Sequence, residues 1–299
     1  EWWIDAIRAC FSRLDPALRQ RTSAIGVSGQ QHGFVPLDRA GNVLAPAKLW
    51  CDTSTAAECD LIMDAVGGAQ GAIATAGNPI MVGYTASKLP WTREHRSQAY
   101  AQLATILLPH DYVNFWLTGE RWMERGDASG TGWLDVRTRQ WSVAMIAATD
   151  PDRDLRPCLP PLVEADAMFP IATAIADELG LPRGVRVSAG GGDNMMAAIG
   201  TGNVSPGVLS MSLGTSGTLF AYAGQAMVDD EGRWAAFCDS TGGWLPLICT
   251  MNCTVATEAV ARLCDFSTKR GDELLAGTRP GAGGLLMLPL FNGERTPNP

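Results

Sequence analysis

Histidine and positive charge are scarce in this sequence of 299 residues. It contains 3 histidines, and its 23 lysine and arginine residues are outnumbered by 31 aspartate and glutamate residues, which gives a formal net charge of −8. Too few basic residues are present for a broad basic surface, so we exclude proteins that hold nucleic acid or an anionic membrane by such a surface. A polyanionic ligand would have to be held locally.

Paired cysteines are also absent. The 8 cysteines are scattered along the chain, and none of them forms a Cys-x-x-Cys pair. This pattern argues against a disulfide framework and a zinc knuckle, and it is typical of reduced thiols in the cytoplasm. Cys249 and Cys253 could share one face of a helix, but with so few histidines we predict small buried residues and no metal site built from protein ligands.

No apolar run is long enough to cross a membrane. The most apolar stretch, residues 285–291, is far shorter than the roughly 18 residues that a spanning helix needs, and Pro289 interrupts it. Residues 1–10 contain acids and two tryptophans where a signal peptide would begin with basic residues. With 46% hydrophobic residues the chain can bury a sizeable core, so we predict a globular protein.

The order of apolar patterns and glycines predicts an α/β fold in two domains. At about 150 residues per domain the length suits two domains, and the composition changes near residue 206, so we place the domains at 1–206 and 207–299. The predicted elements are a helix at 2–18, a strand at 24–28, a hairpin at 34–44, mostly helices over 59–146, a helix at 171–179, a strand at 185–189, a helix from 195, and strands at 208–213 and 218–222.

The first candidate site follows the strand predicted at 185–189, where three glycines precede Asp193 and Asn194. Glycines let a ligand approach the backbone, and Asp193 would project into a cleft at the carboxyl end of the strand. The same aspartate could simply cap the next helix. The two roles are compatible, because the helix dipole would keep the carboxylate ionised and able to accept a proton.

The second candidate is the turn Gly214-Thr215-Ser216-Gly217 between two predicted strands. Its backbone N–H groups and hydroxyls could hold phosphate oxygens without a lysine. The spacing fits neither a Walker loop nor a dinucleotide-binding fingerprint. An ordinary glycine hairpin is the alternative interpretation.

The third candidate is Gln31-His32, which lies between glycines at the end of the strand predicted at 24–28. An amide beside an imidazole suits a polyhydroxylated ligand, because hydroxyl groups need both donors and acceptors. A hydrogen-bonded structural histidine is the alternative, and we favour binding over catalysis. His95 and His110 have no such setting, and we expect them at the surface or at helix ends.

Taken together, these segments resemble the FGGY family of carbohydrate kinases, and within it the members that act on ketopentoses. The resemblance covers essentially the whole chain. It rests on segments that occur in the family's order, at 29–33, 49–52, 83–91, 127–131, 191–194, 212–218 and 293–297.

The resemblance implies two actin-like domains of the ribonuclease H type, with ATP and sugar meeting in the cleft between them. It implies ATP-dependent transfer of a phosphoryl group, with Mg²⁺, to a ketopentose such as D-xylulose, and Asp193 would be the general base. The sugar would be contacted by Gln31, His32, Asp193 and Asn194. The phosphates would be held by Gly214, Thr215, Ser216 and Gly217.

The sequence departs from the family at both ends. Family members begin with a glycine-rich hairpin that helps hold Mg²⁺ and phosphate, and they continue past residues 293–297 through the rest of the second domain. We therefore expect an incomplete second domain and no measurable ATP turnover by the chain as given. Another sugar (ribulose, gluconate or L-xylulose) and a catalytically inactive sugar-binding module are the alternatives. A homodimer is kept as one option for the assembly, and no nucleic-acid or membrane partner is expected.

Overall fold

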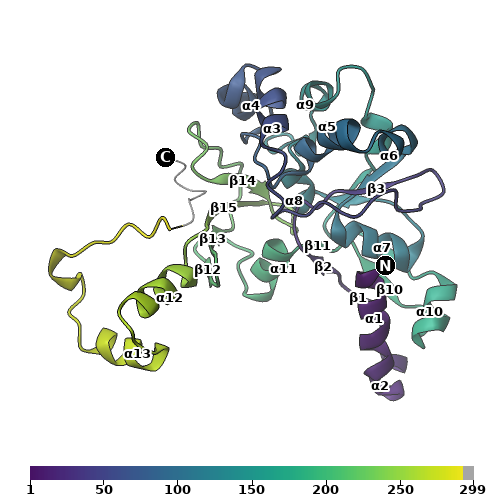
Figure 1. The fold of residues 1–299 in the computed structure, drawn as a ribbon. Coiled ribbons are helices and arrows are strands. Elements are labelled where there is room, and N and C mark those ends of the chain that lie inside the picture. Colours follow the sequence, from purple (N-terminus) through teal and green to yellow (C-terminus); the bar gives the residue numbers. More distant parts are fainter. Residues whose placement is uncertain (292–299) are drawn as a thin grey trace.

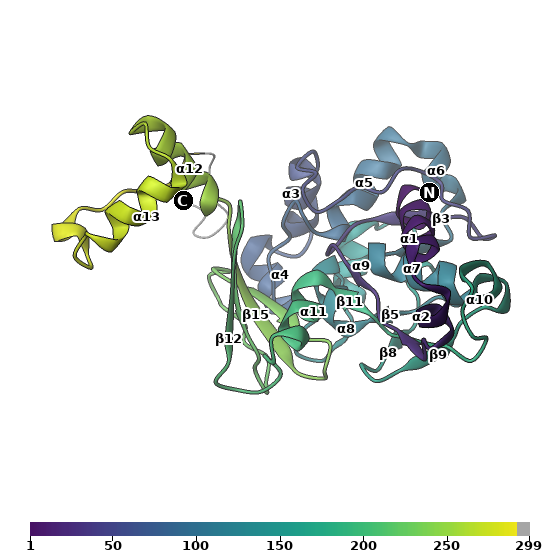
Figure 2. The ribbon, with the colours of Figure 1, turned by 90° about the horizontal axis from the view of Figure 1, so that it is seen from below.

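The computed structural model describes residues 1–291, which form three regions (Figure 1). An α/β body (residues 1–203) is followed by a four-stranded sheet, the second sheet (residues 209–250). Two helices, the projecting helices (residues 254–276), extend from the second sheet away from the body. Figure 2 shows from below that the projecting helices stay clear of the body.

The helix predicted at 2–18 is divided in two. The structure contains α1 (Trp2–Arg13) and α2 (Pro16–Gln20), and Asp15 caps the second helix by accepting the backbone N–H of Ala17 at 2.8 Å. Pro16 occupies the first helical position, where a missing N–H costs nothing because that N–H would have no partner in the helix. The prediction of one continuous helix was therefore wrong, because Asp15 and Pro16 start a second helix.

Two parallel strand pairs form the centre of the body and place the glycine-rich segments beside each other. Strand β1 (Ala24–Ile25) pairs with β10 (Arg186–Ser188), and β2 (Ser28–Gly29) pairs with β11 (Gly191–Gly192). An antiparallel strand, β9 (Met168–Pro170), completes the first sheet on the other side of β10. Because parallel strands end at the same edge of a sheet, the residues after β2 and after β11 meet there.

A group of helices encloses a large apolar core of the body. This core is formed by α3 (Ala56–Asp64), α4 (Gly68–Ala76), α5 (Thr85–His95) and α9 (Val143–Thr149). Trp133 is fully buried in it and donates its indole N–H to Thr149 Oγ1 at 2.9 Å. The prediction of a mostly helical middle segment is confirmed.

The other elements of the body are short. Its remaining strands are β3 (Val35–Leu37), β4 (Thr105–Leu107), β5 (Met123–Glu124), β6 (Leu134–Asp135), β7 (Gln140–Trp141) and β8 (Leu162–Val163). Its remaining helices are α6 (Ser97–Gln102), α7 (Pro109–Thr118), α8 (Arg125–Ala128), α10 (Thr173–Leu179), α11 (Asp193–Gly200) and the 3₁₀ helices η1 (Ser129–Thr131) and η2 (Arg156–Cys158).

The hairpin predicted at 34–44 exists only in part. A turn at Asp38 returns the chain, and Leu37 and Val43 form a single bridge. The main partner of β3 is β4, which is distant in sequence and pairs with it antiparallel. The predicted helix at 171–179 and strand at 185–189 match α10 and β10 closely.

The second sheet is antiparallel in the order β12 (Leu209–Leu213), β13 (Gly217–Ala221), β15 (Trp244–Thr250) and β14 (Ala235–Cys238). Its edge strand β14 is bonded to the body, where Asn78 Oδ1 accepts the N–H of Ala236 at 2.7 Å and Ser129 Oγ accepts that of Cys238 at 2.9 Å. Side chains of the second sheet can therefore complete a site that begins in the body.

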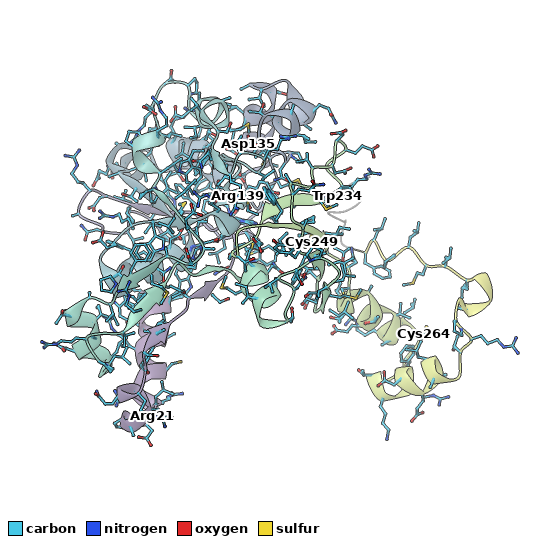
Figure 3. The ribbon with its side chains drawn as sticks, turned by 180° about the vertical axis from the view of Figure 1, so that it is seen from behind. Arg21, Asp135, Arg139, Trp234, Cys249 and Cys264 are labelled. Carbon is cyan, nitrogen blue, oxygen red and sulfur yellow. The ribbon has the colours of Figure 1, made fainter. Side chains whose placement is uncertain are left out.

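The projecting helices are α12 (Thr254–Leu263) and α13 (Thr268–Ala276), followed by the 3₁₀ helix η3 (Ala282–Gly284). Cys249 lies in β15 and Cys253 is the N-cap of α12, so the two do not share a helix face. Both are only partly buried, so the prediction of buried residues was wrong. Figure 3 shows Cys249 in the second sheet and Cys264 on the projecting helices. Within residues 1–291, no helix combines the length and apolarity needed to cross a bilayer.

Candidate functional site

The segments after β2 and β11 are in direct contact. Asn194 Nδ2 donates to Gln31 Oε1 at 2.5 Å, and Gln31 Nε2 lies 3.1 Å from Met195 Sδ. A Cβ added to Gly192 would lie 2.6 Å from Gln31 Cγ, so only glycine leaves room for the glutamine side chain. The first and third segments singled out in the sequence therefore share one site.

The second sheet reaches the same site. Thr218 Oγ1 in β13 lies 3.4 Å from Asn194 Oδ1, and it follows directly after the turn 214–217. Asn194 is thus placed between the glutamine of the body and a hydroxyl of the second sheet. The arrangement offers amide donors and acceptors on one side and a glycine turn close by.

Asp193 is the first residue of α11, and the N-cap is Gly192. The interpretation of Asp193 as an N-cap was therefore wrong by one position. Its carboxylate accepts the backbone N–H of Asn194 at 2.9 Å, and its side chain is exposed. Even so, partial desolvation by the surrounding protein raises the pKa of Asp193, and the charge of Asp127 adds to the effect. This direction is opposite to the one expected from the helix dipole alone.

His32 is buried and held in an unusual backbone conformation. Its φ is +59°, a left-handed value that is uncommon outside glycine. Its carbonyl accepts Lys88 Nζ at 2.9 Å and Thr85 Oγ1 at 3.0 Å, while its N–H donates to Asp127 Oδ1 at 3.2 Å. Such a conformation persists only where the surroundings impose it, which is common at functional sites.

The ring of His32 is enclosed on several sides. Tyr84 lies edge-on at 5.4 Å between ring centroids, and Phe237 of β14 lies at 5.1 Å. Nδ1 of His32 is 3.0 Å from Asp127 Oδ1. The body and the second sheet together fix the position of this imidazole.

A buried charged cluster lies behind His32, and sequence reasoning missed it. His110, expected at the surface or a helix end, is at the start of α7 but fully buried, so the surface expectation was wrong. Its Nε2 lies 3.3 Å from Asp111 Oδ1 and 3.4 Å from Asp127 Oδ2. The apolar residues that precede it, Ile106 to Leu108, were a signal that this helix starts inside the core. His95 is exposed at the end of α5, as expected.

The ionisation of the cluster follows from burial and neighbouring charge. Desolvation opposes the His110 cation, but the carboxylates of Asp111 and Asp127 outweigh it and raise the pKa of His110 to about 9. Desolvation likewise opposes the Asp127 anion, but the neighbouring imidazoles of His110 and His32 lower its pKa to about 2. Burial raises the pKa of Asp111 and of Glu124. At neutral pH the centre of the cluster is therefore an ion pair between His110 and Asp127.

Lys88 is a second buried group that residue-by-residue reasoning overlooked, although it lies in segment 83–91. Its ammonium donates to the carbonyls of Gly83 at 2.7 Å and His32 at 2.9 Å, and desolvation lowers its pKa to about 7. It ties the loop that carries His32 to the start of α5.

The turn 214–217 lies against the N-terminus of α12. Gly214 N–H donates to Ser216 O at 3.1 Å, while the carbonyls of Gly214 and Thr215 accept the N–H groups of Thr254 and Cys253 at 2.9 and 3.1 Å. A shallow hollow of about 180 Å³ opens beside the turn between β12, β13 and β15. None of these bonds uses the backbone N–H of Thr215 or Ser216.

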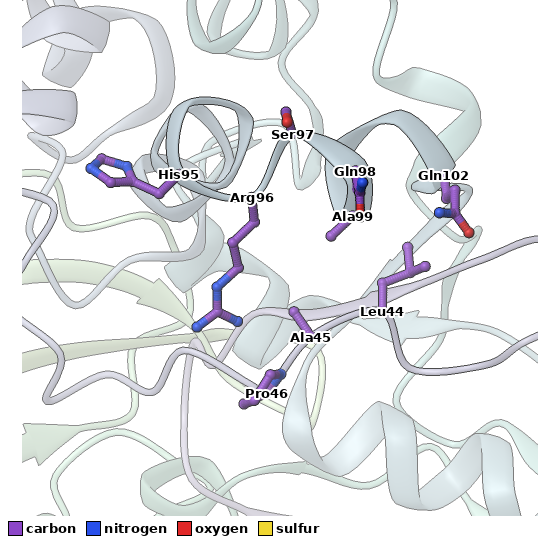
Figure 4. Close-up of a pocket in the computed structure, with 9 residues that line it drawn as sticks. All are labelled: Leu44, Ala45, Pro46, His95, Arg96, Ser97, Gln98, Ala99 and Gln102. Atoms are coloured by element: carbon purple, nitrogen blue, oxygen red, sulfur yellow. The ribbon is translucent and has the colours of Figure 1, made fainter.

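A larger hollow, of about 520 Å³, lies elsewhere, at the junction of α5 and α6 (Figure 4). It is lined by Leu44, Ala45, Pro46, His95, Arg96, Ser97, Gln98, Ala99 and Gln102. None of these residues belongs to the contacts described above, so we do not place the site there.

The described part of the chain does not form a cage for a metal ion. No group of three or more histidine, cysteine, aspartate or glutamate side chains in residues 1–291 is arranged to hold one. Mg²⁺ prefers several oxygen ligands in near-octahedral geometry and is often bound through one or two carboxylates and substrate phosphates. The segment 293–297, which the resemblance also used, lies outside the described residues.

Comparison with known proteins identifies the family. Residues 1–200 match the N-terminal domain of the FGGY family of carbohydrate kinases. The chain belongs to the FGGY family. It is 42% identical to the xylulose kinase of Haemophilus influenzae over 307 residues, covering 99% of this chain and 62% of that protein. It is 39% identical to the xylulose kinase of Streptomyces coelicolor, covering 100% of this chain and 59% of that one.

The FGGY fold is also seen in a solved structure. The crystal structure of a protein described as a xyloylose kinase from Brucella ovis superposes with a TM-score of 0.87 and 34% identity, over 98% of this chain and 59% of that one. The predicted fold class, that of the two-domain FGGY sugar kinases, is confirmed. The chain spans about 60% of the length of these relatives.

Proposed function

We propose that the protein to which this chain belongs phosphorylates a ketopentose at the expense of ATP, and that the ketopentose is D-xylulose. The observation that carries the proposal is the meeting of Gln31, His32, Asp193 and Asn194 at one edge of the paired parallel strands. The names of the relatives, xylulose kinases at 42% and 39% identity, support the choice of sugar.

In this proposal the amides of Gln31 and Asn194 and the imidazole of His32 bind sugar hydroxyls. Hydroxyl groups both donate and accept, and two amides with one imidazole supply both kinds of partner. Because Gln31 and Asn194 already bond to each other, they are held ready before the sugar arrives.

Asp193 is proposed as the general base. It accepts the proton of the primary hydroxyl while that oxygen forms a bond to the γ-phosphorus of ATP, and the bond between this phosphorus and the bridging oxygen breaks to release ADP. The raised pKa of its carboxyl brings its basicity closer to neutral pH, which favours proton transfer. A positioned base of this kind is worth roughly 10²- to 10⁴-fold in rate.

The nucleotide phosphates are proposed to lie at the turn 214–217. The amides of Thr215 and Ser216 and their hydroxyls are suited to phosphate oxygens. Gly214 and Thr215 are exposed, and Ser216 is half-buried. Mg²⁺ would accompany the nucleotide and neutralise its charge, and residues 1–291 do not fit a cage of their own for it.

Three further parts of the proposal concern organisation. The sugar-binding domain is assigned to residues 1–206 and the start of the ATP-binding domain to 207–299, which agrees with the gap between α11, ending at Gly200, and β12, starting at Leu209. A homodimer and a cytoplasmic location stay predictions.

The test is sugar-dependent release of ADP by the protein in the length of its relatives. D-xylulose should give the highest kcat/KM in a panel with ribulose, gluconate and L-xylulose. A higher kcat/KM for another sugar would mean that this sugar is the substrate, while the protein would still be a sugar kinase. Sugar binding in calorimetry without any turnover would favour an inactive sugar-binding module.

A further inference from the structure

Asp127 is the residue that contacts both the backbone and the ring of His32. Its Oδ1 lies 3.2 Å from the His32 backbone nitrogen and 3.0 Å from the ring Nδ1. Asp127 lies on α8 and is fully buried, 95 positions away from His32 in the sequence. Neither the segment around His32 nor the segment around Asp127 predicts this contact from its own sequence.

The ring of His32 has little freedom to turn away from Asp127. Tyr84 and Phe237 pack against it, and a Cβ on Gly130 would be 1.8 Å from its Cε1. Nδ1 of His32 lies 3.0 Å from a carboxylate oxygen of Asp127. A hydrogen on Nδ1 makes this contact attractive, whereas a lone pair on Nδ1 would be repelled by the oxygen. In the neutral ring this places the hydrogen on Nδ1 and leaves the lone pair on Nε2.

The groups around Asp127 keep it an acceptor. Its second oxygen, Oδ2, lies 3.4 Å from His110 Nε2, which also faces Asp111 at 3.3 Å. The carboxylate of Glu124 accepts the backbone N–H groups of Asp127 at 2.5 Å and Gly126 at 2.6 Å. These bonds turn the Glu124 carboxylate away from the Asp127 carboxylate. Ser240 Oγ donates to the same Glu124 at 3.0 Å. The two neighbouring imidazoles hold the pKa of Asp127 near 2 despite its burial.

We propose that Asp127 is a positioning residue that fixes His32 as the tautomer with hydrogen on Nδ1, so that Nε2 accepts a hydrogen bond from a sugar hydroxyl. The proposal rests on the proposed function, in which His32 binds the sugar. Asp127 itself touches no substrate, and it acts through the imidazole. A carboxylate behind a histidine selects the tautomer in this way in other proteins as well.

The test is the tautomer of His32, read by ¹⁵N NMR of the chain labelled at histidine. With only 3 histidines in the sequence, His32→Gln and His95→Gln variants assign the spectrum. The wild type should show a protonated Nδ1 and an unprotonated Nε2 for His32. In Asp127→Ala no acceptor faces Nδ1, so the preference for hydrogen on Nδ1 should be lost and the form with hydrogen on Nε2 should appear.

Asp150→Ala is the matched control. Asp150 is also buried and charged, but it pairs with Arg93 at 3.0 Å and with the Tyr100 hydroxyl, away from His32. Its variant should leave the His32 tautomer unchanged. Calorimetry with D-xylulose should show binding weakened by about 10- to 100-fold in Asp127→Ala, the usual effect of losing an orienting partner, and by less than about threefold in Asp150→Ala.

A wild-type His32 protonated on Nε2, or an unchanged tautomer in a folded Asp127→Ala, would overturn the proposal. If Asp127→Ala does not fold, the wild-type spectrum alone still decides, because it must show hydrogen on Nδ1. The predicted tautomers without any D-xylulose binding would uphold the positioning role of Asp127 on the imidazole and contradict the proposed function.

Discussion

Gly130 offers a sharp test of how His32 is seated. It lies in η1, is buried, and has no left-handed backbone angle, so space rather than conformation requires glycine there. A Cβ at this position would lie 1.8 Å from Cε1, 2.0 Å from Nδ1 and 2.6 Å from Nε2 of His32. The methyl group added by Gly130→Ala would therefore clash with the imidazole of His32.

The size of the effect follows from these distances. To reach an ordinary contact of 3.4 Å, the ring must retreat by about 1.6 Å, but Asp127, Tyr84 and Phe237 occupy its other sides. Overpacking a buried site typically costs about 1–3 kcal/mol of unfolding free energy. A functional group displaced by about 1 Å typically costs on the order of 100-fold. We expect Gly130→Ala to lower the free energy of unfolding and to weaken the binding of D-xylulose.

The assay pairs urea denaturation with calorimetry of D-xylulose binding. Gly184→Ala is the control, because Gly184 is exposed and a Cβ there meets no atom within 4 Å. It should match the wild type in both measurements. If Gly130→Ala also matched the wild type in both, the ring of His32 would not lie where the structure puts it.

Three other variants test neighbouring parts of the site. His32→Ala should raise the KM for the sugar and leave that for ATP nearly unchanged, since the imidazole makes no phosphate contact in the proposed function; equal increases in both would mark it as structural. For His110→Gln, the stability advantage of the wild type should be complete below pH 6.5 and disappear as the pH rises through about 9, because the folded state raises the pKa of His110; a larger advantage at high pH would contradict this. For Lys88→Met, the wild type should gain stability relative to the variant between pH 7 and about 10.5, because burial lowers the pKa of Lys88; a difference independent of pH would show that the amine is not desolvated.

Local patterns predicted only part of the strands and the helix that carry the glycine segments. The strands predicted at 24–28 and 185–189 correspond to β1 with the start of β2 and to β10. Strand β11 was not predicted, and α11 begins at Asp193, where a helix was expected only from 195. The broken helix at Pro16 also had a local signal, an aspartate followed by proline, which the prediction of one helix ignored.

The partners of His32 could not be predicted in this way. Asp127 and His110 come from different helices, and their contacts depend on how β4, α7 and α8 pack against the paired strands. Periodicity indicates that a residue is buried but does not identify what it meets. For the same reason β3 pairs with the distant β4 instead of completing the hairpin predicted next to it.

The central claim is that Asp193 acts as the base in phosphorylation of D-xylulose. The most direct measurement is ADP release by the protein in the length of its relatives, comparing the wild type with Asp193→Asn, which keeps the volume of the side chain and removes its basicity. The account predicts that kcat falls by roughly 10²- to 10⁴-fold, with Asp177→Asn, at an exposed aspartate of α10, as the unaffected control. A kcat for Asp193→Asn within about threefold of the wild type would contradict it, because a positioned base is worth far more than that.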